Sequence, residues 1–190
     1  KEDCMAIVNG DDAVLARQEF LNSKIVTYGL TKNKVKATNI TCDEAGFYTF
    51  KVKNTSIKLS IPGQHNVLNA LAAVAVGLEH EVTMENIKKG IERVKPVEKR
   101  MQIYKNSNVT VMDDSYNGNP SSCQAALVTA SDIKVGTGGR KIAVLGDMLE
   151  LGPQAPELHA EIADLPSMGA IDRVYTVGPL MAHLHAALPG

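Results

Sequence analysis

The chain has 190 residues, of which 44% are hydrophobic and 4% aromatic, and it contains no Trp. This length suits one large domain or two small ones with aliphatic cores. Its 20 basic and 21 acidic residues are interspersed and leave a net charge of −1, which argues against a nucleic-acid or membrane-surface role. Three widely spaced cysteines match no metal motif, so we expect reduced thiols in a cytoplasmic protein, and we expect a monomer.

Hydrophobic periodicity predicts short strands and helices in the first half of the chain. The expected strands are Met5–Val8, Ile25–Tyr28, Val35–Ile40, Phe47–Lys53 and Ile57–Ile61. The expected helices are Ala13–Leu21, Asn66–His80 and a segment that is capped by Thr83 and runs to about Val94. The last two strands alternate apolar and polar residues, as half-exposed antiparallel strands do.

The pattern changes at Lys95-Pro96-Val97-Glu98-Lys99, where a proline disfavours helix in the residue before it. We therefore expect two domains, residues 1–97 and 98–190. In the second, short apolar strands alternate with helices, which predicts a Rossmann-like α/β domain on a parallel sheet. Its expected strands are Met101–Tyr104, Val109–Met112, Lys141–Leu145 and Arg173–Val177, and its expected helices are Ser121–Ser131, Pro156–Leu165 and Leu180–Leu188.

Two asparagines mark the start of the helix expected from residue 66. Asn66 and Asn69 are three residues apart, so they share one helix face and can offer two carboxamides to one ligand. Carboxamides suit the edge of a purine or a phosphate ester, and Gly63 lets the backbone approach closely. The alternative is structural: Asn66 caps the helix and Asn69 is a satisfied polar residue of the core.

A dense polar loop, residues 113–120 with the sequence DDSYNGNP, follows an expected strand. Ligands of open α/β sheets bind at such carboxyl strand ends. Carboxylates accept hydrogen bonds from ribose hydroxyls and a tyrosine ring can flank a base, which makes Asp114, Tyr116 and Asn119 candidate ligand contacts. A loop with an Asx turn and a helix cap is the structural alternative.

Two further segments carry candidate residues. Arg100, in Lys99-Arg100-Met101, has a guanidinium that can bind phosphate through two hydrogen bonds, and otherwise it is a solvated linker charge. The strand expected at Lys141–Leu145 ends in the sequence GDMLELG. This acidic and apolar loop supplies three candidate substrate contacts: Asp147, Met148 and Glu150.

Together these segments resemble the Mur ligase family, ATP-dependent enzymes that add amino acids to the muramoyl peptide of bacterial cell walls. The helix start is similar to the family's GxHNxxNxxAA, and Asn9-Gly10-Asp11-Asp12 is similar to its NADD turn, which we interpret as structural. Lys99-Arg100-Met101 is similar to its GRM triplet, with Lys99 in place of Gly. DDSYNGNP, and LGDMLELG followed by Glu157-Leu158-His159, look like the members that attach D-alanyl-D-alanine.

The resemblance implies an α/β fold, with the later part of the central ATPase domain followed by a Rossmann-like C-terminal domain that is incomplete at its end. It implies an ATP- and Mg²⁺-dependent amide ligase of peptidoglycan and cell wall synthesis, which serves cell shape and division. Its substrates would be UDP-N-acetylmuramoyl-tripeptide and D-alanyl-D-alanine. The residues implied to bind ATP are Asn66, Asn69, Arg100, Asp114, Tyr116 and Asn119. The last four would reach it by closure about a hinge near residues 95–99.

Family members also use a GxxGKT-type P-loop, a Glu and a His that bind Mg²⁺, and a carbamylated Lys. No P-loop sequence occurs here, and the other groups would precede Lys1. We therefore expect no catalytic residue and no metal ligand in this segment, which alone would be inactive. Two alternatives stay open. A related ligase such as folylpolyglutamate or cyanophycin synthetase would share the helix motif without LGDMLELG, and a non-catalytic Rossmann-like binding module would have no nucleotide role.

Overall fold

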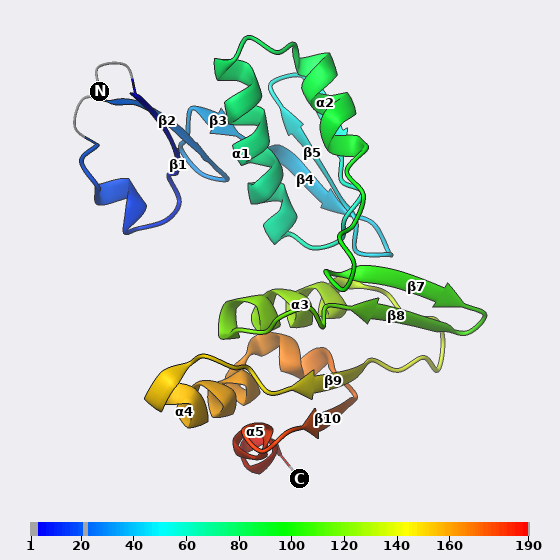
Figure 1. The fold of residues 1–190 in the computed structure, drawn as a ribbon. Helices are drawn as coiled ribbons and strands as arrows, with labels where there is room; N and C mark the ends of the chain where they lie inside the picture. Colours follow the sequence, from blue (N-terminus) through cyan, green and yellow to red (C-terminus); the bar gives the residue numbers. More distant parts are fainter. Residues whose placement is uncertain (1–3, 21–22, 190) are drawn as a thin grey trace. The chain divides into compact units, whose positions relative to one another are not determined.

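The computed structural model describes residues 4–20 and 23–189 (Figure 1). The chain divides into two compact units, Lys1–Asp43 with Phe47–Lys95, and Glu44–Gly46 with Pro96–Gly190. Each unit has its own hydrophobic core. None of the helices in the described part of the chain is long and apolar enough to cross a membrane.

Two small sheets and two helices form the first unit (Figure 1). The parallel sheet has the order β1 (Cys4–Asn9), β2 (Ser23–Gly29) and β3 (Val35–Lys36). The antiparallel sheet has the order β4 (Thr38–Cys42), β5 (Tyr48–Val52) and β6 (Thr55–Lys58). A 3-10 turn, η1 (Leu15–Arg17), follows β1, and helices α1 (His65–Glu79) and α2 (Met84–Glu92) follow β6. Helix α1 packs on the parallel sheet and on α2, and α2 packs on β6.

The apolar face of α1 forms the centre of the first core. Val67, Leu71 and Val74 recur at helical spacing and are fully buried, as the sequence pattern predicts. They share this core with Phe50 of β5 and Ile57 of β6. Burial of one such side chain contributes about 1.5–3 kcal/mol. The buried face fixes the helix, so its polar N-terminal face has a defined direction.

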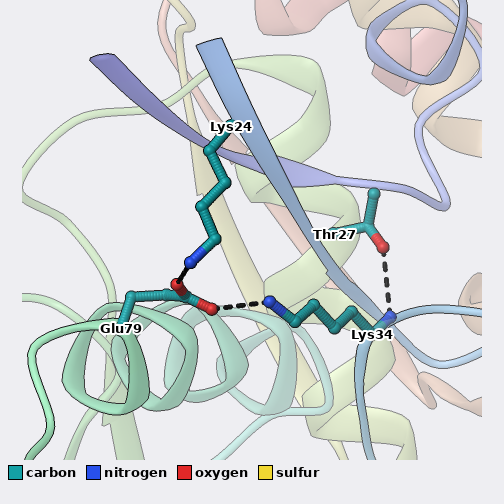
Figure 2. Close-up of polar contacts among 4 residues, drawn as sticks. All are labelled: Lys24, Thr27, Lys34 and Glu79. Atoms are coloured by element: carbon teal, nitrogen blue, oxygen red, sulfur yellow. Dashed lines mark hydrogen bonds and ion pairs between the residues drawn. The ribbon is translucent and has the colours of Figure 1, made fainter. Parts of the chain in front are cut away.

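Glu79 joins the C-terminal end of α1 to the parallel sheet. Its carboxylate accepts hydrogen bonds from the ammonium groups of Lys24 on β2 and of Lys34, the latter at 2.7 Å (Figure 2). The backbone N–H of Lys34 donates in turn to the Thr27 hydroxyl at 3.1 Å. The Glu79 side chain is only 10% exposed. The two lysine hydrogen bonds lower the pKa of Glu79 to about 2, so it is ionised at neutral pH.

The second unit combines an antiparallel hairpin, a parallel pair of strands and several short helices (Figure 1). The hairpin is formed by β7 (Gln102–Asn106) and β8 (Val109–Asp113), and the parallel pair by β9 (Ile142–Gly146) and β10 (Arg173–Val177). The helical segments are α3 (Pro120–Asp132), η2 (Gly152–Gln154), α4 (Ala155–Ala160), η3 (Glu161–Asp164), η4 (Pro166–Ala170) and α5 (Met181–Ala187). The core contains Leu127, Met148, Ile162, Met181 and Leu184.

The predicted α/β class is confirmed, and so is the parallel arrangement of the last two strands. The prediction was wrong in adding the first two strands of this unit to that parallel sheet. β7 and β8 pair with each other in antiparallel orientation. The reason is the length of their connection, because only residues 107–108 separate them and a parallel crossover needs roughly a dozen residues or more.

Three further elements differ from the sequence prediction. The strand expected at Val35–Ile40 divides between β3 and β4, where the chain passes from one sheet to the other at the buried Ala37. The helix expected at Ala13–Leu21 contains only η1, and Leu21 lies outside the described residues. The helix expected at Pro156–Leu165 ends at Ala160 and continues as η3. Isolated helical patterns this short are marginal, so packing decides their extent.

We predict that Glu79→Gln destabilises the protein near neutral pH, because the neutral amide loses two charge-assisted hydrogen bonds. The folded-state pKa of about 2 lies below the ordinary value of 4.5. The ionised carboxylate therefore adds stability above about pH 4.5, and this addition disappears as the pH falls toward 2. Urea denaturation at several pH values should show the free-energy difference between wild type and variant shrinking over this range.

Glu85→Gln is the matched control. Glu85 pairs with Lys89 one turn along α2, and the Glu85 side chain is 73% exposed. Because the pair is exposed, loss of the Glu85 charge should change the unfolding free energy by less than about 0.5 kcal/mol. Equal effects of the two variants, or a pH-independent effect of Glu79→Gln, would contradict the prediction.

Candidate functional site

The two asparagines at the start of α1 lie on one face, as their spacing predicts. Asn69 donates from Nδ2 to the Oδ1 atom of Asn66 at 3.0 Å. Asn66 donates from Nδ2 to the carbonyl oxygen of Pro62 at 2.7 Å. Asn69 is exposed and Asn66 is half-buried. This chain of hydrogen bonds orients the Asn69 carboxamide at the surface.

The structural alternative, in which Asn66 caps the helix and Asn69 lies in the core, was wrong. The residue before α1 is Gln64, whose side chain makes no capping hydrogen bond, and Asn69 is outside the core. Gly63 has a φ of +100°, a conformation that residues with a side chain rarely adopt. Gly63 therefore sets the direction in which the chain enters α1, and Asn66 stabilises this entry through Pro62.

The register of the β7–β8 hairpin brings the linker triplet to the polar loop. Gln102 pairs with Asp113 at the open end of the hairpin, so the residues just outside this pair become neighbours. The backbone N–H of Met101 donates to Asp114 Oδ1 at 3.0 Å. The backbone N–H of Tyr116 donates to the Lys99 carbonyl at 3.1 Å.

Three predicted site residues form one cluster at this place. The Arg100 guanidinium lies over the Tyr116 ring, with its Cζ atom 4.4 Å from the ring centroid, within cation–π range. Both side chains are exposed, and the Asp114 carboxylate holds the backbone next to Arg100. The arrangement presents a cation beside polar acceptors, which suits an anionic ligand with hydroxyl groups.

The linker triplet forms a strained turn. Lys99 has a φ of +59° and Met101 a φ of +47°, in the left-handed region that favours glycine. Such a conformation costs a residue with a side chain of order 1–3 kcal/mol. Lys99 adopts this conformation although the GRM triplet that this segment resembles has glycine at its position. Packing offsets the strain, because Met101 is only 5% exposed and its sulfur lies 3.9 Å from the Thr129 hydroxyl.

Asn119 caps the start of α3, as the structural alternative for the polar loop predicts. Its Oδ1 atom accepts a hydrogen bond from Ser122 N–H at 2.8 Å, and its own N–H donates to Ser122 Oγ at 3.0 Å. This reciprocal capping box fixes the start of the helix. That Asn119 contacts a ligand stays a prediction. In the same loop, hydrogen bonds from the side chain and backbone of Ser115 lower the pKa of Asp113, which keeps that carboxylate ionised.

The loop after β9 serves mainly the core and α5. Met148 is 2% exposed and packs in the second core. Asp147 accepts a hydrogen bond on Oδ1 from Met181 N–H, at 2.8 Å, where α5 begins. Of the three predicted substrate contacts, only Glu150 has an exposed side chain. Substrate binding by this loop stays a prediction.

His159 has a structural role that the sequence did not reveal. It is fully buried, its Nε2 atom lies 2.9 Å from the N–H of Met148, and its Nδ1 atom lies 2.6 Å from the Ala155 carbonyl. Nε2 accepts from an N–H and a carbonyl can only accept, so the proton is on Nδ1 and the ring is neutral. The ring therefore fastens the loop after β9 to α4. The available signal in the sequence was the spacing, because His159 lies four residues after Ala155 and therefore on the same helix face.

The Cys123 thiol on α3 is not activated as a nucleophile. Burial, with a contribution from Asp114, raises the pKa of the Cys123 thiol to about 11. A thiol with this pKa stays protonated near pH 7 and is a poor nucleophile. Within residues 4–20 and 23–189, His, Cys, Asp and Glu form no group of three or more that is placed to hold a metal ion.

Two family models match this chain. The Mur ligase middle domain matches residues 1–77, and the Mur ligase, glutamate ligase domain matches residues 99–190. The chain therefore belongs to the Mur ligase family, in agreement with the resemblance in its motifs.

Within this family the chain is similar to UDP-N-acetylmuramoyl-tripeptide–D-alanyl-D-alanine ligases. That of Bacillus subtilis is 34% identical over 187 residues, which are 97% of this chain and 40% of the relative. That of Escherichia coli is 32% identical over 185 residues, 93% of this chain and 40% of the relative. A crystal structure of MurF from Acinetobacter baumannii matches with a TM-score of 0.84 at 29% identity, covering 97% of this chain and 41% of that one. The chain thus spans about 40% of the length of these relatives.

We predict that Lys99→Gly raises the unfolding free energy by up to about 1 kcal/mol, because glycine adopts the left-handed conformation without a steric cost. The greater entropy of glycine in the unfolded chain offsets part of the gain. Urea denaturation of the purified variant measures the difference.

Lys105→Gly provides the comparison, because Lys105 is an exposed lysine in the regular strand β7. There glycine should lower the unfolding free energy by roughly 0.5–1 kcal/mol. If both variants are destabilised alike, the left-handed turn carries no strain.

Proposed function

We propose that the protein containing this chain is an ATP-dependent ligase that joins D-alanyl-D-alanine to UDP-N-acetylmuramoyl-tripeptide in peptidoglycan synthesis. The observation that carries this proposal is the cluster of Arg100, Tyr116 and Asp114, in which two of the family's motifs meet. The substrates follow from the named relatives, which align with nearly the whole chain. We also propose a monomeric, cytoplasmic enzyme.

The proposed reaction has two steps. The terminal carboxylate of the tripeptide attacks the γ-phosphate of ATP, which forms an acyl phosphate and releases ADP. The amine of D-alanyl-D-alanine then attacks the acyl carbon, which forms the amide, loses a proton and expels phosphate. Both steps gather negative charge on phosphoryl oxygens, and a nearby guanidinium stabilises such charge.

The side chains of the described residues fit ATP by their chemistry. In the first unit, the Asn66 and Asn69 carboxamides suit the donor and acceptor edge of adenine. In the second, the Asp114 carboxylate suits ribose hydroxyls and Arg100 suits phosphate. We propose a further contact from Asn119, and we propose that Tyr116 contributes to the site beside Arg100. Mg²⁺ would neutralise phosphate charge, and we propose no ligand for it among the described residues.

We predict that Asn69→Ala, in the intact gene product, weakens ATP binding by about 1–3 kcal/mol, because the adenine edge loses its partner. Binding of the UDP-linked tripeptide should change much less. Isothermal titration calorimetry with each substrate measures both affinities. Asn86→Ala removes an exposed asparagine from α2 and serves as the control, which should change neither affinity. Equal losses for both substrates upon Asn69→Ala would instead indicate a folding role.

We predict that Arg100→Ala lowers kcat and changes ATP affinity little, because the guanidinium acts mainly on the charge that develops in the transition state. Arg100→Lys should recover only part of the activity, since an ammonium keeps the charge but loses the planar fork. Steady-state kinetics at saturating D-alanyl-D-alanine measures both variants. Arg93→Ala removes an exposed arginine at the end of α2 and should be silent. An unchanged kcat upon Arg100→Ala would remove Arg100 from the site.

A further inference from the structure

Arg100 is held at its backbone from both sides. The residue before it, Lys99, accepts a hydrogen bond from Tyr116 N–H at 3.1 Å. The residue after it, Met101, donates to the Asp114 carboxylate at 3.0 Å. Both neighbours are in the left-handed conformation, and the Met101 side chain is anchored in the interior. The Cα atom of Arg100 is therefore fixed relative to the polar loop.

The side chain of Arg100 needs a separate restraint. It is exposed and long, and the entropy lost when such a side chain becomes ordered opposes ligand binding. The Tyr116 ring supplies the restraint, because it lies under the guanidinium at 4.4 Å in a cation–π contact. A guanidinium held over a ring face can still donate from its N–H groups, which is how it would bind a phosphoryl oxygen.

We propose that Tyr116 is a positioning residue for Arg100. Its ring holds the guanidinium in the orientation that receives the phosphoryl group, so Tyr116 acts on the reaction through Arg100. The sequence suggested a different role, in which the ring flanks the nucleotide base. This inference rests on the proposed function, in that Arg100 meets phosphate during the ligase reaction.

A double-mutant cycle in the intact gene product separates the two roles of Tyr116. Tyr116→Leu should lower kcat about 2- to 5-fold, while Tyr116→Phe, which keeps an aromatic face, should keep most of the activity. In the Arg100→Ala background, Tyr116→Leu should have no further effect. Independent, multiplying losses, or a loss confined to the KM for ATP, would overturn the proposal. Tyr104→Leu removes a tyrosine of β7 that is 47% exposed and should leave kcat unchanged.

An NMR measurement tests the stack without relying on activity. In protein labelled with ¹⁵N-arginine, the Arg100 side-chain resonances, assigned by their loss in Arg100→Ala, should carry a ring-current shift. The shift should persist in Tyr116→Phe and disappear in Tyr116→Leu. Its absence from the wild type overturns the positioning role even if the ligase is active. If the wild type has no ligase activity, the proposed function is overturned. The NMR result then still shows whether the Tyr116 ring holds the Arg100 guanidinium.

Discussion

The two-residue turn between β7 and β8 is the constraint on which the cluster of Arg100, Asp114 and Tyr116 depends. A turn this short allows the two strands to pair only in antiparallel orientation. It also fixes the register, in which Gln102 lies opposite Asp113. One residue further out, Met101 meets Asp114, and Arg100 comes to lie over Tyr116. A register shift of one residue would turn the side chains of one strand to the opposite face, and Arg100 and Tyr116 would no longer be in contact.

Other contacts in the second unit restrain the segments around this cluster. The Asn119 capping box fixes the chain where the polar loop enters α3. The buried side chain of Met101 anchors the linker triplet, which carries Arg100. His159 fastens the loop after β9 to α4, which keeps Met148 in the core. A site that binds charge benefits from such supports, because groups oriented beforehand need no costly reorganisation when the ligand arrives. The packing of Met101 also offsets the backbone strain at Lys99.

In the first unit, one helix performs two tasks at its two ends. The N-terminal end of α1 presents Asn66 and Asn69, and its C-terminal end carries Glu79 between two lysines. The apolar face between them is buried against strands of the same unit. Because the interior of the helix is fixed by packing, the carboxamides are displayed from a rigid scaffold, with one oriented by the other.

The amino-acid pattern predicts the α/β class, the apolar face of α1, the shared face of its asparagines and, through its motifs, the Mur ligase family. These features depend on period and spacing, which are local properties of the chain. Three features appear only in the tertiary structure. Residues Val35–Ile40 divide between two sheets, the Arg100 guanidinium lies over the Tyr116 ring, and the side chains of Met148 and His159 are buried. Each of these features depends on contacts between residues that are separated in the sequence. A local sequence pattern carries no information about the free energy of such contacts.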